Sequence, residues 1–202
     1  DYRNQGIGYR LKRAQWQMVR QQGIDRITWT YDPLLSRNAW LNITRLGTVC
    51  NTYLPDFYGT MRDELNLGVA SDRFQVDWWV NTRRVNHRLS REARDPLELD
   101  HYLNGEARIL NPAHHTRDGG LETSEWKGYS ADPLETFLLV EIPVNFLGLK
   151  SLNPALAGRW RLHTRQIFQD LFPLGYLVTD FVHLSGEEPR SYYVLCHGDS
   201  TL

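Results

Sequence analysis

Cysteine is scarce in this sequence, with only Cys50 and Cys196 among its 202 residues. Neither belongs to a Cys-x-x-Cys pair or to a cluster with histidine, so the sequence predicts neither a disulfide framework nor a thiolate metal site. His114 and His115 are adjacent, but they lie in a stretch rich in Pro and Gly without clear cysteine or carboxylate partners. We therefore expect reduced, buried thiols, loop histidines and no bound metal.

An excess of positive charge is also lacking, since the formal net charge is -1. Proteins that bind nucleic acids or membrane surfaces usually carry a basic excess, so neither partner is expected. No apolar run approaches the roughly 20 residues of a membrane-spanning helix, and no signal peptide is visible. We expect a cytoplasmic protein.

Hydrophobic residues make up 41% of the chain and include seven Trp, which is enough for an extensive core. The first clear pattern is helical and covers residues 7–22. Ile7, Leu11, Ala14 and Met18 recur at four-three-four spacing, so we expect them to form its inner face. Residues 24–31 alternate polar and apolar side chains, which predicts a strand.

Further helices and strands alternate along the chain. Ser36 is a candidate cap for a short helix at 37–46 that Gly47 ends. Pro154 takes the favoured first position of a longer helix. The inner face of that helix should consist of Leu156, Trp160, Thr164, Ile167, Phe168 and Leu171. Strands are predicted at residues 48–53, 74–80, 137–142, 176–184 and 191–196, and a charged helix at 84–94.

This order of elements predicts an α/β fold. Periodicity fades between residues 81 and 133, and residues 111–120 have the composition of a loop. We therefore divide the chain into an α/β core at 1–90, a connector at 91–135 and an α/β extension of one strand, a helix and two strands at 136–202.

The turn before the first helix is the motif with the clearest chemical meaning. It consists of Arg3, Asn4, Gln5, Gly6, Ile7 and Gly8, and Tyr9 follows it. The first turn of a helix presents unpaired N–H groups and the positive end of the helix dipole, and glycine lets a phosphate approach the backbone. By itself the pattern also fits a plain glycine turn or another nucleotide-phosphate site, because it lacks the third glycine of a dinucleotide fingerprint and the Gly-Lys of a P-loop.

The order of glycine turn, helix, strand, short helix, Gly47 and strand resembles the acyl-CoA-binding core of the GNAT superfamily of N-acyltransferases over about residues 1–80. A branch of that superfamily with an extra C-terminal segment is similar in several strings. These are WTYDPL at 29–34, NAWLN at 38–42, YLPDFYG at 53–59, SDRF at 71–74, VEIP at 140–143, WR at 160–161, TR at 164–165 and GY at 175–176.

The resemblance implies a mixed sheet flanked by helices, with acetyl-CoA or succinyl-CoA as co-substrate. It implies direct transfer of the acyl group to the amine of a small molecule, an amino acid being one candidate. It places acyl-CoA between two parallel strands, the second at residues 24–31 and the first upstream of Arg3, so we expect the natural protein to extend upstream. The oligomeric state stays open, and a homodimer is one arrangement.

The resemblance also implies where a catalytic acid should be. Ile43 occupies the place of the Tyr that serves many members of the superfamily, so Tyr53 and Tyr58 are the substitute candidates. Core or rim packing is the alternative for both tyrosines. The departure at Ile43 also leaves open a protein that binds CoA without catalysis. Asp32 is a candidate base or ammonium-binding group, and formation of the turn before Pro33 is its alternative role.

The remaining candidates concern binding. Asn38 and Asn42 are one helical turn apart and can bind the pantetheine amides, whereas helix initiation and solvation are their alternatives. Trp29 and Thr30 belong to the strand expected to line the cleft. Arg73 can bind a substrate carboxylate with two hydrogen bonds, although a surface ion pair is as consistent with the pattern.

Overall fold

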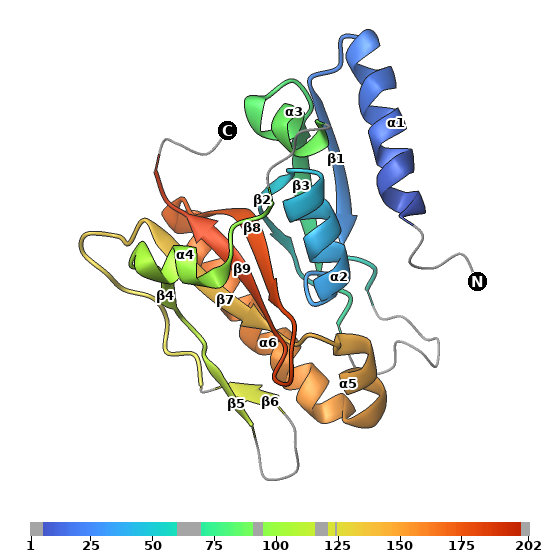
Figure 1. Ribbon diagram of the computed structural model, residues 1–202. Coiled ribbons are helices and arrows are strands. Elements are labelled where there is room, and N and C mark those ends of the chain that lie inside the picture. Colours follow the sequence, from blue (N-terminus) through green and yellow to red (C-terminus); the bar gives the residue numbers. More distant parts are fainter. Residues whose placement is uncertain (1–5, 60–69, 91–94, 116–120, 124, 199–202) are drawn as a thin grey trace.

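A computed structural model describes residues 6–59, 70–90, 95–115, 121–123 and 125–198. Figure 1 shows the arrangement of its helices and strands. The first half contains α1 (Ile7–Gln21), β1 (Arg26–Tyr31), α2 (Ser36–Ala39), the π-helical turn η1 (Trp40–Arg45), β2 (Val49–Leu54), β3 (Arg73–Trp79), α3 (Arg83–Leu89) and α4 (Leu99–Asn104).

The second half contains β4 (Arg108–Ile109), β5 (Ala113–His115), β6 (Leu121–Thr123), β7 (Phe137–Ile142), α5 (Phe146–Leu152), α6 (Pro154–Leu171), the 3₁₀ turn η2 (Phe172–Leu174), β8 (Leu177–Leu184) and β9 (Arg190–Cys196). The strands expected from sequence alternation all form, within two residues of their predicted bounds. The predicted α/β class is confirmed.

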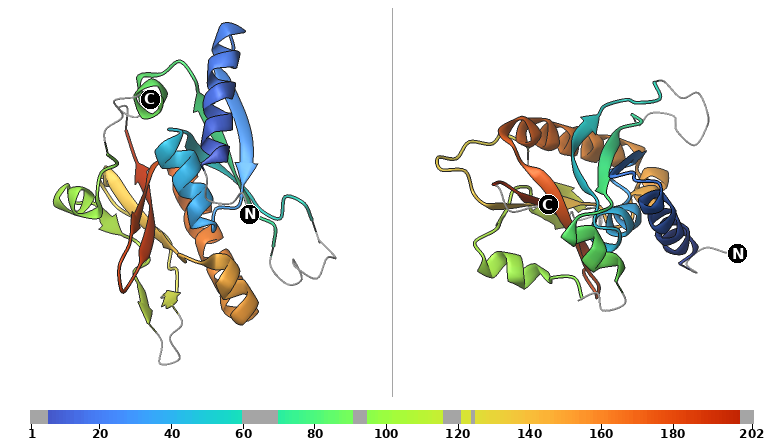
Figure 2. Two further views of the ribbon diagram at one scale, coloured as in Figure 1. Left: turned by 45° about the vertical axis from the view of Figure 1, so that its right-hand side comes forward. Right: turned by 90° about the horizontal axis from the view of Figure 1, so that it is seen from above.

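Seven strands form one mixed sheet in the order β1-β3-β2-β8-β9-β7-β4. Neighbours are antiparallel except β4 and β7, and Cys50 of β2 faces Val178 of β8 at the junction between the first and last parts of the chain. β5 and β6 form a separate small hairpin. Both Figure 1 and Figure 2 place α1 beside β1 at one end of the molecule and this hairpin at the other.

The region expected to connect the core and the extension contains α4, β4, β5 and β6. The predicted loop at 111–120 includes β5 within its described part. These elements are short, and the strands have only two or three residues. A strand of that length has too few positions to display an alternation, and its pairing partner decides that it forms.

α1 forms where predicted, but its orientation differs from the expectation. Leu11 is 66% exposed and Met18 is 53% exposed, although both were expected on the inner face. The opposite face packs instead, through Tyr9, Trp16 and Val19. Trp16 also donates a hydrogen bond from its indole N–H to the carbonyl of Val80 at 2.8 Å. Burying the aromatic rings and making this hydrogen bond stabilise the observed orientation of α1 more than burying Leu11 and Met18 would, because large rings bury more surface than Leu or Met.

The helix α6 packs with the face predicted for it, since all six residues of that face are buried. Phe168 lies edge-on to Phe74 of β3 at 4.7 Å between ring centroids, and to Tyr193 of β9 at 5.6 Å. Phe74 also contacts Tyr31 at the end of β1. The central core therefore joins β1, β3, β9 and α6, and it fixes the helix against the ends of strands from both halves of the chain.

Candidate functional site

The glycine turn leads directly into α1. Its residues Arg3, Asn4 and Gln5 lie outside the described residues. Gly6 has φ of 68° and precedes the helix with no side-chain cap, and the first helical turn contains no acidic residue. Among the described residues, no atom lies within 4 Å of a Cβ placed at Gly6. Such a helix start suits an anionic group.

Side chains of α1 turn from this start towards the sheet. Lys12 places its ammonium 3.4 Å from the centre of the Trp29 ring. Burial lowers the pKa of Lys12. Tyr9 is partly buried, with the guanidinium of Arg45 4.7 Å from its ring centre. Gly8 lies close to η1, because a Cβ there would be 3.7 Å from Leu41. The start of α1 is thus held against β1 and η1.

The two asparagines expected to bind pantetheine have different environments. Asn42 is 6% exposed. Its amide oxygen accepts from the indole N–H of Trp29 at 3.0 Å, and its amide nitrogen donates to the carbonyl of Asn38 at 2.9 Å. A ligand would have to replace both bonds, so the geometry of Asn42 favours a role in holding Trp29. Asn38 is partly exposed near the start of α2. Thr30 is also partly exposed and pairs with Gln75 of β3.

A bidentate ion pair connects the end of β1 to α6. Both terminal nitrogens of Arg161 donate to the carboxylate of Asp32, at 2.8 and 2.6 Å. The Arg161 side chain is 2% exposed and that of Asp32 is 17% exposed. Asp32 also accepts from the backbone N–H of Leu34 at 2.9 Å. Asp32 therefore forms the turn that precedes α2 and neutralises a buried guanidinium.

A second carboxylate, Asp72, lies at the start of β3 and is the centre of a denser network. Its oxygens accept from Arg165 at 2.9 and 2.6 Å, from the phenol of Tyr53 at 2.6 Å and from the backbone N–H of Asp56 at 2.9 Å. Burial alone would raise the pKa of the Asp72 carboxyl, but these hydrogen bonds outweigh it and lower that pKa. Burial and the neighbouring carboxylate raise the pKa of Tyr53 well above its usual range.

Arg161 and Arg165 are one helical turn apart on α6, so this helix presents two guanidinium groups to two carboxylates. We call Asp32, Tyr53, Asp72, Arg161 and Arg165 the ion-pair cluster. Asp32 and Tyr53 were singled out from the sequence as candidates, but Asp72 and the two arginines were not recognised as their partners. Two Arg residues four positions apart, each directly after a residue of the predicted inner face of α6, were the signal for them.

Tyr58 and Arg73 lie next to this cluster in the chain. The guanidinium of Arg73 is 4.9 Å from the centre of the Tyr58 ring, a cation–π contact. Tyr58 is 55% exposed, and its backbone N–H donates to Ser71 at 3.0 Å. Ile43 is fully buried in the core. The candidate tyrosines therefore differ, since Tyr53 is bound to a carboxylate and Tyr58 lies at the surface.

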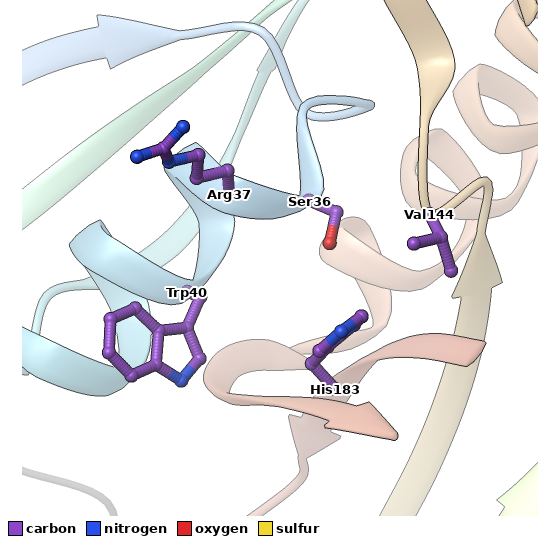
Figure 3. Close-up of a pocket in the computed structure, with 5 residues that line it drawn as sticks. All are labelled: Ser36, Arg37, Trp40, Val144 and His183. Atoms are coloured by element: carbon purple, nitrogen blue, oxygen red, sulfur yellow. The ribbon is translucent and has the colours of Figure 1, made fainter. Parts of the chain in front are cut away.

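A cavity of about 350 Å³ lies between α2, the end of β8 and the segment after β7. Figure 3 shows its lining residues: Ser36, Arg37, Trp40, Val144 and His183. Ser36 was expected to cap α2, but Leu35 holds that position and the hydroxyl of Ser36 lies 2.9 Å from that of Ser191. No sequence pattern predicts this cavity, because its residues come from three distant segments.

Two further features bear on the class of protein. No helix within the described ranges is long and apolar enough to cross a membrane. Among these same residues, no group of three or more His, Cys, Asp or Glu side chains is placed to hold a metal ion. Comparisons with protein-family models, curated proteins and solved structures give no match to this chain.

Proposed function

We propose that this protein is an acyl-CoA-dependent N-acyltransferase that uses acetyl-CoA or succinyl-CoA. The observation that carries the proposal is the start of α1, where Gly6 is left-handed, no described residue comes within 4 Å of a Cβ placed on it, and the first helical turn holds no acidic residue. The N–H groups and dipole of a 15-residue helix are suited to the pyrophosphate of CoA.

The neighbouring strand supports the same assignment. β1 is the terminal strand of the sheet and pairs only with β3 among the described strands. Its other edge can exchange hydrogen bonds with an extended ligand, and the two amides of pantetheine are such a ligand. The order of α1, β1, α2 with η1, β2 and β3 also follows the order that the resemblance to the GNAT superfamily implies.

The acceptor is proposed to be the amine of a small molecule, with an amino acid as the leading candidate. Asp32 already accepts from Arg161 and Leu34, so an ammonium group would take its remaining acceptor capacity, and Arg73 offers a guanidinium for a carboxylate. The amine attacks the thioester after losing a proton, the C–S bond breaks, and the CoA thiolate takes up a proton. Tyr58 is the more accessible of the two candidate acids, because Tyr53 already donates to Asp72.

A protein that binds CoA without catalysis is the second candidate, and one observation favours it. The position where a catalytic Tyr is expected holds Ile43, which is fully buried. Release of the CoA thiol from acetyl-CoA and succinyl-CoA across a panel of D- and L-amino acids separates the two functions. Thermal stabilisation by CoA with no turnover of any amine would establish the second.

The phosphate site itself is tested at Gly6 by the pair Gly6→Asp and Gly6→Asn. Both residues tolerate the left-handed backbone, so the pair differs mainly in charge. Asp at a helix start stabilises the helix by about 0.3–1 kcal/mol, yet it repels a phosphate. We expect Gly6→Asp to unfold at the higher temperature but to bind CoA at least about tenfold more weakly than Gly6→Asn.

Gly23 provides the matched control at the other end of α1, since it also has positive φ, 72°, and open space around it. The Gly23→Asp variant should bind CoA as the parent protein does. Equal CoA affinity in Gly6→Asp and Gly6→Asn would contradict a phosphate at this turn. Stabilisation by ATP or NAD but not by CoA would replace the acyl-CoA assignment with a nucleotide site.

A further inference from the structure

Another cavity lies between α6 and the end of β6, in the part of the molecule opposite α1 (Figure 1 and Figure 2). The indole N–H of Trp160 donates to the carbonyl of Leu121 at 2.7 Å and holds the helix against this strand. The cavity has a volume of about 260 Å³. Drug-sized sites usually measure about 300–1,000 Å³, and a cavity of about 150 Å³ can hold benzene. There is therefore room here for a molecule with one ring and a short substituent.

The buried part of the lining is apolar except for one histidine. Leu156 and Trp160 are 3% and 1% exposed. His163 is 9% exposed, and its ring lies edge-on to that of Trp160 at 6.1 Å between centroids. Nε2 of His163 is buried without a hydrogen-bond partner among the described residues. Such atoms are rare in folded proteins, so this nitrogen points to a bound molecule that supplies the missing partner.

The charged residues of the lining lie on its exposed side. Arg159 and Glu122 form an ion pair, with side chains 59% and 36% exposed, and Glu125 is also exposed. The pair leaves one carboxylate in excess, which disfavours an anionic ligand. Burial lowers the pKa of His163 from 6.5 to about 4, so the buried part of the cavity disfavours a positive charge as well. The lining therefore favours a neutral ligand.

The imidazole of His163 also selects the polar group of the ligand. A neutral imidazole has one nitrogen that donates and one that accepts. A carbonyl can bond Nε2 only when this nitrogen carries the proton, and an N–H group only when it does not. A hydroxyl both donates and accepts, so it satisfies Nε2 in either tautomer.

We propose that this cavity binds a small neutral alcohol or phenol with an apolar body. Its hydroxyl forms a hydrogen bond with the imidazole of His163, and its apolar body contacts Leu156 and Trp160. The site shares no residue with those assigned to CoA or to the acceptor amine, so it does not depend on acyl transfer.

NMR titration of the protein with benzyl alcohol, benzylamine and benzoate tests the ligand class. These probes have one shape, and at neutral pH they are neutral, cationic and anionic, respectively. We expect benzyl alcohol to bind at least about tenfold more tightly than either charged probe. Equal or tighter binding of benzylamine or benzoate, or no binding of benzyl alcohol at millimolar concentration, would overturn the proposal.

Matched variants locate the hydroxyl of the ligand. His163→Leu removes both ring nitrogens and should weaken benzyl alcohol binding about tenfold. His163→Gln keeps an amide that can donate and accept, so its affinity should stay within about threefold of the parent protein. His87 on α3 is exposed, and His87→Leu should leave binding unchanged.

The ring ¹⁵N signals of His163 should shift during the titration, whereas those of His87 should not. Benzyl alcohol binding that is unaltered in His163→Leu would place the ligand elsewhere and refute the site. His163→Leu leaves no unpaired polar atom at this position, so the variant should fold, which circular dichroism checks.

Discussion

The ion pair between Asp32 and Arg161 gives the sharpest test of how the two halves of the chain are held together. Arg161 is 2% exposed, so Asp32→Asn would leave a guanidinium buried without its counter-charge. Breaking a buried pair in this way costs about 3–5 kcal/mol. We expect the lower end, about 3 kcal/mol, because the 17% exposure of Asp32 admits some solvent.

The reciprocal change, Arg161→Met, should also cost about 3 kcal/mol, since it removes the ion pair and the contact of the guanidinium with the Phe146 ring at 4.9 Å. The double variant leaves no unpaired charge, and the amide oxygen of the introduced asparagine can still accept from the backbone N–H of Leu34 as Asp32 does. We expect the double variant to lose about 3 kcal/mol rather than the sum of the two, a coupling of about 3 kcal/mol.

Urea unfolding monitored by circular dichroism gives these free energies, provided that the slope of the transition is unchanged. The pair Arg159 and Glu122 is the control, because it also involves α6 but is 59% and 36% exposed. Its neutralisation should change the free energy of unfolding by less than about 1 kcal/mol. Losses for Asp32→Asn and Arg161→Met that simply add, or that equal the control, would refute the buried pair.

Two other predictions concern burial. Burial lowers the pKa of His163 from 6.5 to about 4, so the unfolded chain takes up a proton first as the pH falls. The contribution of neutral His163 to the free energy of unfolding is therefore complete above pH 6.5 and is lost towards pH 4. His163→Leu should flatten the dependence of the urea midpoint on pH in this window, whereas His87→Leu should not. Leu11→Lys and Met18→Lys should each change the unfolding free energy by less than about 0.5 kcal/mol, and Trp16→Ala should cost about 2 kcal/mol, with the reverse order contradicting the orientation of α1.

The sequence by itself determined most of the elements and one complete packing face. The alternation in β3 and the apolar run of β7 each specify a strand, since side chains on a pleated strand point to opposite faces in turn. The six inner residues of α6 recur at helical spacing along most of the helix, and all are buried. Long, regular patterns of this kind leave one orientation that buries them.

Only the tertiary structure decided which face of α1 packs and which charges pair. The aliphatic and aromatic residues of α1 lie on opposite sides of the helix. The aromatic side packs on the sheet, where the indole N–H of Trp16 donates to the carbonyl of Val80. Asp32 meets Arg161 and Asp72 meets Arg165 across separations of 129 and 93 residues. The cavity of Ser36 and His183 arises in the same way. Local sequence patterns do not predict such contacts, because contacts between distant residues depend on the order in which strands join the sheet.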